Sequence, residues 1–168
     1  MSGRLRTTFG SSRGSRLLAW RDNLPRILWH NVLMAHASAF FAPPNPAFAY
    51  DWKTVEQGVP LSAMDEFAAY SGLPVKSLLE VVIPARTLKH RKQKQEPLST
   101  DESDRLRRVA RIYDLTVRVY GDAADARNWL TTPKRRFNER TPLTLLRTQA
   151  GEDAVQEFLV QIEEGMYI

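Results

Sequence analysis

The sequence of 168 residues predicts an all-α protein, in which a helix-turn-helix-like helical domain precedes a small C-terminal helical domain. Two observations predict this class. From residue 58 onward, apolar residues recur with the helical period, and no useful stretch alternates as a half-buried strand does. Helix-starting and helix-ending residues also flank the periodic stretches. We expect three regions: a basic and partly disordered arm or linker over 1–50, the helix-turn-helix region over 51–97, and a helical domain over 98–168.

The net charge of +5 is unevenly distributed along the chain. Residues 1–94 carry thirteen Lys and Arg against six Asp and Glu, a net charge of +7, whereas residues 95–168 carry a net charge of −2. This asymmetry indicates a polyanionic partner for the first part and a different partner for the second. The alternative is ordinary charge that keeps a protein in solution.

Several function classes are excluded by residue types that are missing. The chain has no cysteine, which excludes disulfides, thiolate nucleophiles and the common zinc sites, and which fits a reducing cytoplasm. No stretch approaches the ~20 apolar residues that span a bilayer, so we expect no membrane partner. The glycines form no phosphate-binding motif, and His30, His36 and His90 lack metalloprotease spacing. We therefore expect no enzyme activity, no metal and no cofactor.

The arm admits more than one interpretation. Its arginines form a flexible basic segment, unless translation starts at Met34: Arg4, Arg6, Arg13 and Arg16. Its bulky aromatic residues would suit an amphipathic interaction segment, because exposed aromatic rings need a partner: Trp20, Trp29, Phe40 and Phe41. Prolines forbid a continuous helix at its end: Pro43, Pro44 and Pro46.

Three helices are expected in the second region. The first ends at Gly72, and its apolar face is Leu61, Met64, Phe67 and Ala68. Pro74 then begins a short helix over 75–82, and Pro84 begins another that runs to about Lys92. The last two helices with their tight turn have the form of a helix-turn-helix.

The helix after Pro84 is strongly basic, and the window 81–95 contains no acidic residue. Arg86, Lys89 and His90 fall on one face opposite Leu88. Such a helix can enter a major groove, with Arg86 at base edges and later basic residues on phosphates. A solvated basic face is the alternative. The candidate DNA-binding residues are Arg86, Thr87, Lys89, His90, Arg91, Lys92 and Lys94.

The third region begins with a capping box of Ser99 and Glu102 before a long helix. Its apolar face is expected to be Leu106, Val109, Ala110, Tyr113, Val117 and Tyr120, with its end at Gly121. Asp122 caps a shorter helix that Pro133 terminates, and Thr141 with Pro142 begins the next. The last helix ends at Gly165 and packs through Val155, Phe158, Leu159 and Ile162.

Five stretches recur together in one known family. They are RTLKHRK (86–92), LSTDESDRL (98–106), GD followed by WLTTP (121–133), RTPL with Leu146, Thr148 and Gly151 (140–151), and IEEGMY (162–167). In this order and spacing, from Gly58 to the C-terminus, the chain resembles the Xre/MbcA/ParS antitoxins, with their Xre-like helix-turn-helix and toxin-binding domain. Members are encoded beside RES-domain toxins that act on NAD, either degrading it or transferring its ADP-ribose.

The resemblance implies an antitoxin of a type II toxin–antitoxin pair in the bacterial cytoplasm. It implies that the chain occludes the active site of a RES-domain toxin and represses the shared operon as a homodimer or in a higher hetero-oligomer with the toxin. The alternative is a stand-alone transcription regulator whose C-terminal domain oligomerises. Carried over from the family, the toxin-binding residues are Trp129, Pro133, Arg140, Glu164, Met166, Tyr167 and Ile168. For Trp129 the alternative is a core position, because a Trp on a short helix is usually buried.

Three features depart from the family pattern. A basic, bulky loop over 134–139 replaces a small-residue loop, and Ile83-Pro84 replaces the usual Ser-type cap before the basic helix. Residues 1–50 have no counterpart in the family. The loop is expected to alter the choice of toxin, and the cap to alter the geometry of DNA contacts.

Overall fold

The computed structural model describes residues 45–165, and over that range it contains eight α-helices, two 3-10 helices and no strand. The predicted all-helical class is therefore confirmed for this part of the chain. The expectations for the arginines, Met34 and the aromatic residues of the arm lie outside the described residues. So do the predicted contacts of Met166, Tyr167 and Ile168.

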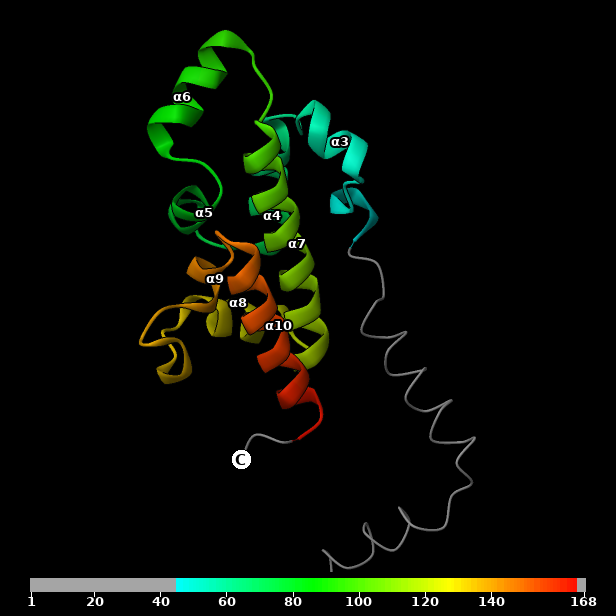
Figure 1. Cartoon of the computed structure of the whole chain (residues 1–168), viewed down its shortest axis with the longest axis vertical. Coiled ribbons are helices and arrows are strands. Elements are labelled where there is room, and N and C mark those ends of the chain that lie inside the picture. Colours follow the sequence, from blue (N-terminus) through cyan, green and yellow to red (C-terminus); the bar gives the residue numbers. More distant parts are fainter. Residues whose placement is uncertain (1–44, 166–168) are drawn as a thin grey trace, which may run out of the picture. The chain divides into compact units, whose positions relative to one another are not determined.

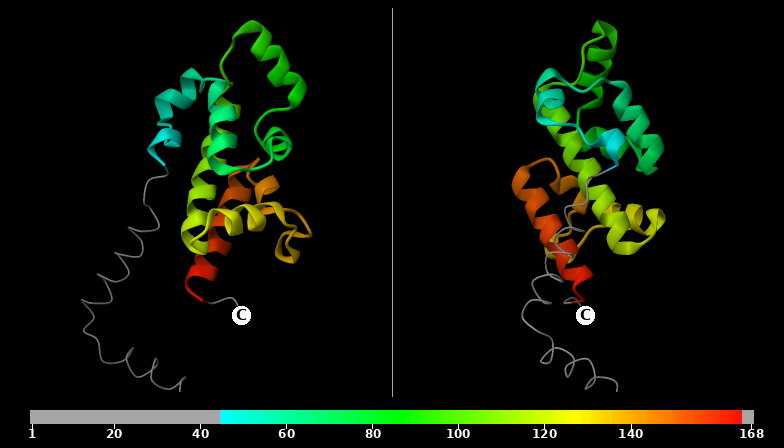
Figure 2. Two further views of the ribbon diagram at one scale, coloured as in Figure 1. Left: turned by 180° about the vertical axis from the view of Figure 1, so that it is seen from behind. Right: turned by 90° about the vertical axis from the view of Figure 1, so that its right-hand side faces the viewer.

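Helix α7 organises the described fold (Figure 1). The elements before it are η1 (Pro46–Phe48), α3 (Trp52–Gln57), α4 (Ser62–Ser71), α5 (Val75–Val81) and α6 (Ala85–Lys94). Helix α7 itself spans Thr100–Tyr120, and it is followed by α8 (Ala123–Thr131), η2 (Arg135–Phe137), α9 (Pro142–Leu145) and α10 (Gln149–Glu163). Seen from behind and from the side, α10 lies along the C-terminal half of α7 (Figure 2). None of the helices from residue 45 to 165 is long and apolar enough to cross a membrane.

The helix ends follow the predicted chemistry. Ser99 and Glu102 form the capping box of α7, and Gly121 ends that helix at a left-handed φ of 73°. Asp122 caps α8 by accepting hydrogen bonds from the backbone of Asp125 and Ala124, and these bonds hold its pKa below the ordinary value. Thr141 caps α9. These local signals are confirmed because each depends on residues within one helical turn.

Helix α7 is buried on more than the single face that its periodicity predicts. Leu106, Val109, Ala110 and Tyr113 are buried as expected, but Ile112, Leu115 and Thr116 are buried as well. The second buried stripe arises because α7 contacts η1, α3 and α4 as well as α8 and α10. A helix covered from two directions needs two apolar stripes.

Residues 45–50, which the sequence assigns to the arm, pack against the helical core. The backbone N–H of Asn45 donates to Asp114 Oδ2 at 2.6 Å. Phe48 is only 5% exposed, and its ring centroid lies 5.2 Å from that of Phe67 and 5.3 Å from that of Tyr70. The segment that leads into α3 is therefore part of the folded unit.

Helix α10 approaches the end of α9 very closely at Gly151. A Cβ atom placed on Gly151 would lie 2.0 Å from the backbone oxygen of Leu145, so only glycine fits. The next residue, Glu152, is 2% exposed, and its carboxylate lies 2.8 Å from the guanidinium of Arg111 on α7. Burial raises the pKa of Glu152 because desolvation outweighs the attraction of Arg111.

Glu152→Gln should therefore change stability in a pH-dependent way. Because the folded pKa is raised, folding favours the protonated acid, and this contribution is lost as the pH rises from the ordinary value of 4.5 through the folded pKa. The free energy of unfolding of Glu152→Gln, measured by urea titration, should rise relative to wild type between acidic and neutral pH. Asp153→Asn, at an exposed neighbouring position, controls for the loss of one negative charge. A difference that falls with pH would contradict this assignment.

Candidate functional site

The turn between α5 and α6 is anchored in the protein interior. Val81, Val82 and Ile83 are at most 2% exposed, and Arg105 of α7 donates to the backbone oxygen of Val82 at 3.4 Å. Helix α6 begins at Ala85, directly after its N-cap Pro84, and has no buried residue of its own. It is consequently held at its start and presented outward over most of its surface, as Figure 1 shows at the top of the molecule.

The predicted DNA-binding residues differ in their exposure to solvent and in whether they form ion pairs. Arg86, Lys89 and His90 are exposed and form no ion pair with another described residue, whereas Thr87 is half-buried. Lys92 and Lys94 are exposed too, but Lys92 Nζ lies 3.2 Å from Asp65 and Lys94 Nζ lies 4.0 Å from Glu96. Surface pairs of this kind contribute little and can exchange for another anion. The unpaired cations of α6 thus lie in its first two turns.

Arg91 has a different environment from the other basic residues of α6. Its side chain is 21% exposed, and its Nε lies 2.9 Å from Glu102 Oε2 on α7. Its Nη1 also donates to the backbone oxygen of Pro97 at 3.2 Å. These contacts fasten the C-terminal part of α6 to the start of α7, so a phosphate would have to compete with a nearly buried carboxylate for this guanidinium.

The motif Glu102-Ser103-Asp104-Arg105 joins the start of α7 to its surroundings. Glu102 accepts a hydrogen bond from the backbone of Ser99 at 2.7 Å as well as pairing with Arg91. Ser103 Oγ accepts from the backbone N–H of Val59 at 2.9 Å, although Ser103 is fully buried. Sequence reasoning used Glu102 only as a helix cap. The missed signal was that polar residues at adjacent helix positions cannot all face solvent, so some must have buried partners.

Asp104 continues this network toward the C-terminal half. It accepts from Arg107 at 2.9 Å and from Arg108, which is 7% exposed and also donates to the backbone oxygen of Leu146 at 3.2 Å. Desolvation raises the pKa of Asp104, but hydrogen bonds from Arg108 and Arg107 outweigh it and leave the pKa below its ordinary value. Asp104 therefore remains charged and holds Arg108 against the turn after α9.

Glu102→Ala should destabilise the chain by about 2 to 3 kcal/mol, because it removes half of the capping box and leaves Arg91 without its closest carboxylate. Urea unfolding monitored by circular dichroism measures the loss. Asp101→Ala, at an exposed position in the same turn, is the matched control and should cost less than about 1 kcal/mol. Equal losses for the two variants would show that the Arg91–Glu102 pair does not stabilise the fold.

The residues predicted to meet a toxin are only partly accessible. Pro133, Arg140 and Glu164 are exposed, whereas Trp129 is 6% exposed. The Trp129 ring lies 5.8 Å from Phe158 and 5.9 Å from Tyr120, between centroids. Trp129 is thus a core residue of the isolated chain and offers little surface to a partner.

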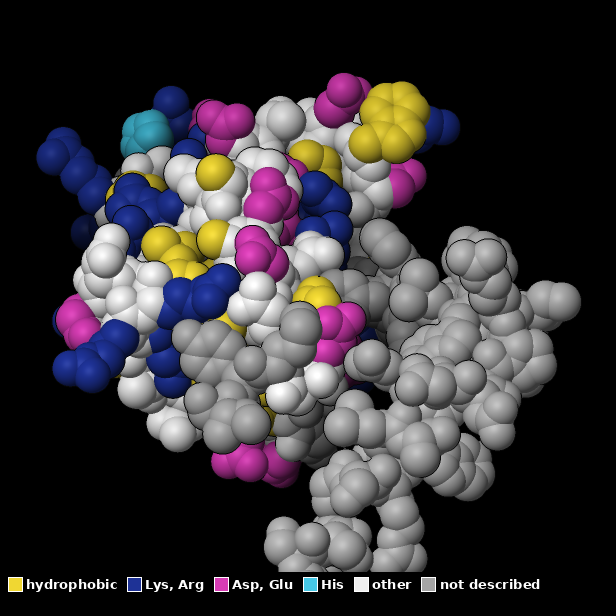
Figure 3. Space-filling model, turned by 60° about the horizontal axis from the view of Figure 1, so that its bottom comes forward, with side chains coloured by type: hydrophobic (Ala, Val, Ile, Leu, Met, Phe, Trp, Pro, Cys, Tyr) yellow, Lys and Arg dark blue, Asp and Glu magenta, His cyan; other side chains and the backbone are white. Residues whose placement is uncertain are grey.

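The basic loop over 134–139 is a well-packed hairpin. Its ends pair through the backbone of Lys134, which donates to Arg140 at 3.0 Å. Phe137 is buried and lies edge-on to Phe158 with 5.6 Å between centroids, and Arg136 lies 3.5 Å from Glu157. Partial burial lowers the pKa of Lys134. The hairpin is held against α10 and carries exposed cations. In the view of Figure 3, most of the visible Lys and Arg side chains lie on the left of the molecule.

Comparison with known proteins finds two matching domains, which meet within α7. Residues 53–111 match the model of the antitoxin Xre-like helix-turn-helix domain, and residues 116–165 match the antitoxin Xre/MbcA/ParS C-terminal toxin-binding domain. In the described part of the chain, no group of three or more His, Asp or Glu side chains is placed to hold a metal ion.

Three curated relatives carry the name "Antitoxin Xre". The protein of Pseudomonas putida is 49% identical over 84 residues, which are 50% of this chain and 53% of that protein, so the chain spans about half of that relative. The proteins of Yersinia enterocolitica and Photorhabdus laumondii are each 27% identical, over 68% and 67% of this chain and 78% and 77% of their own lengths. The chain is therefore similar to these antitoxins over two successive segments, one matching a helix-turn-helix domain and the other a toxin-binding domain.

Proposed function

We propose that this chain is the antitoxin of a type II toxin–antitoxin pair in the bacterial cytoplasm, and that it neutralises a RES-domain toxin that uses NAD. The observation that carries the proposal is the match of residues 116–165 to a toxin-binding domain. The exposed hairpin and the end of α10 supply a surface within that range. Neutralisation by a bound protein is stoichiometric, so the chain needs no catalytic group of its own.

The proposed toxin surface combines the hairpin with the C-terminal end of α10. Pro133 and Arg140 flank the hairpin, and Glu164 follows the last turn of α10. Phe137 and Arg136 tie the hairpin to α10, so the two segments present one rigid surface. Met166, Tyr167 and Ile168 follow Gly165 in the sequence, and apolar and aromatic side chains of this kind suit the buried centre of an interface. Trp129 supports the surface from within.

The proposed mechanism is steric occlusion of the toxin's active site. A segment with bulky apolar residues can enter a cleft, and an exposed cation such as Arg140 can pair with carboxylates at its rim. Binding that fills the cleft excludes the substrate without any change in the chemistry of the toxin. The occlusion model therefore requires residues 165–168.

Deletion of residues 165–168 should abolish rescue of growth when the chain is co-expressed with the product of the adjacent gene. NAD consumption by that product should then be as fast as without the antitoxin. Asp153→Ala, an exposed change near the start of α10, is the control and should rescue fully. Full rescue by the deletion variant would refute occlusion, whereas failure of the full chain to co-purify with the adjacent product would favour a stand-alone transcription regulator with an oligomerising C-terminal domain.

We further propose that α6 binds operator DNA and represses the operon. Arg86 lies in the first turn of α6 and is the candidate for base reading, while Lys89 and His90 continue the same exposed face toward phosphates. Lys92 and Lys94 add exchangeable cations beyond them. A two-fold dimer would place two such helices on two half-sites.

Arg86→Ala should reduce the preference for operator over random DNA by roughly 1 to 3 kcal/mol. Lys89→Ala should weaken both DNAs similarly and shallow the salt dependence by about one unit, because a phosphate contact carries little sequence information. Fluorescence anisotropy with the upstream promoter fragment and a random duplex measures both effects. Lys53→Ala removes an exposed cation from α3 as the control. Unchanged binding by both α6 variants would exclude α6 as the DNA-binding element.

A further inference from the structure

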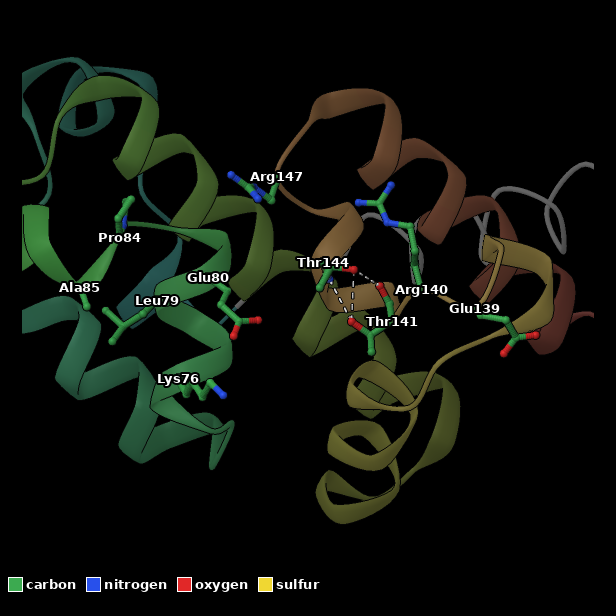
Figure 4. Close-up of a pocket in the computed structure, with 10 residues that line it drawn as sticks. All are labelled: Lys76, Leu79, Glu80, Pro84, Ala85, Glu139, Arg140, Thr141, Thr144 and Arg147. Carbon is green, nitrogen blue, oxygen red and sulfur yellow. Dashed lines mark hydrogen bonds between the residues drawn. The ribbon is translucent and has the colours of Figure 1, made fainter.

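A groove of about 870 Å³ lies beside the start of α6 (Figure 4). One wall comes from α5 and the first residues of α6, where Lys76, Pro84 and Ala85 line it. The facing wall comes from the segment around α9, where Arg140, Thr144 and Arg147 line it. The groove therefore brings the helix-turn-helix together with the C-terminal half of the chain.

Both walls are attached to the same part of α7, which sets the width of the groove. Arg105 donates to the backbone oxygen of Val82 behind the first wall at 3.4 Å. Arg108, one turn further along, donates to the backbone oxygen of Leu146 behind the second wall at 3.2 Å. Since Arg108 is 7% exposed and held by Asp104, the walls are connected through buried contacts rather than through a loop.

The groove carries an excess of unpaired positive charge. Lys76, Arg140 and Arg147 are exposed and form no ion pair with another described residue. Two acids also line it, but Figure 4 shows the Glu139 carboxylate turned away from the other lining residues, which leaves Glu80 as the inward acid. Three cations against one such acid favour an anionic occupant.

The positive surface extends from this groove along α6. A second cavity of about 460 Å³ shares Leu79 and Ala85 with the first groove and is edged by Lys89 and Lys92. The cations of the C-terminal half thus continue to Lys89 and Lys92 of α6, whereas Arg86 lines neither cavity. A single extended anion could contact both parts.

We propose that this groove binds the sugar–phosphate backbone of DNA beside the base pairs that α6 reads, with Arg147, Arg140 and Lys76 as phosphate ligands. A helix that enters a major groove has phosphates flanking it, and at least half of protein–DNA hydrogen bonds go to the backbone. Arginine offers two parallel donors that match a phosphate. The inference rests on the proposed DNA binding by α6 and adds that the C-terminal half takes part in it.

Arg147 distinguishes this groove from the proposed toxin surface. Arg140 belongs to both, because it flanks the hairpin and lines the groove. Arg147 follows α9 and was not among the residues carried over from the family as toxin contacts, so its loss should affect DNA and not the toxin.

The test measures binding of the full chain to a fluorescent random-sequence duplex across a series of salt concentrations. Arg147→Ala and Lys76→Ala should each weaken binding and shallow the slope of log affinity against log salt by about 0.9 per lost phosphate contact. Arg147→Lys should retain most of the slope. Arg135→Ala removes an exposed hairpin cation outside the groove and should match wild type. Circular dichroism checks that each variant is folded.

Each result bears on a different claim. If Arg86→Ala and Lys89→Ala weaken DNA binding while folded Arg147→Ala and Lys76→Ala match the Arg135→Ala control, the groove proposal is overturned and α6 alone binds DNA. If no variant of α6 or of the groove weakens binding, the proposed DNA-binding function fails together with the groove. Loss of toxin rescue by Arg147→Ala with unchanged DNA binding would make the groove a protein-binding surface and would overturn the proposal as well.

Discussion

Helix α7 must be covered on two sides, and the rest of the described fold depends on this constraint. Ile112, Leu115 and Thr116 are buried in addition to the face that contains Leu106 and Tyr113. No single neighbouring helix can cover both stripes, so α7 contacts the segments before it and the segments after it. The helix-turn-helix half and the C-terminal half consequently share one central element, and each completes the core of the other.

The polar start of α7 adds orientation to this packing. Apolar burial is largely non-directional, whereas a hydrogen bond or ion pair specifies which atoms face each other. Glu102 holds Arg91 of α6, Arg105 holds the turn before α6, and Arg108 holds the turn after α9. About two turns of helix, from Glu102 to Arg108, thus determine where the basic helix and the groove walls lie. The start of α7, which the sequence predicts only as a helix cap, therefore connects the helix-turn-helix half to the C-terminal half.

Charge in this protein has two separate uses. Arg91 and Arg108 are largely withdrawn from solvent and fasten elements together, while Arg86, Lys89 and Arg147 are exposed. The hairpin shows this division only in part, because Arg136 pairs with Glu157 but is exposed, as Arg135 is. Counting basic residues in a segment therefore overstates the cations available to a polyanion. The division also explains why a chain of modest net charge can present concentrated positive surfaces.

The sequence by itself determined the helical class, the helix ends and the basic character of α6, because capping, glycine termination and apolar period act within one or two turns. The family motifs named Pro133, Arg140 and Glu164 as candidate toxin contacts, and the structure shows these three residues exposed. The assignment of a basic face to Arg86, Lys89 and His90 agrees with their exposure. Only the tertiary structure decided that Trp129 is core, that Arg91 pairs with Glu102, and that Arg147 and Lys76 line the same groove. These facts join residues from different helices, and the spacing of residues along the chain holds no information about which distant groups will share a buried contact.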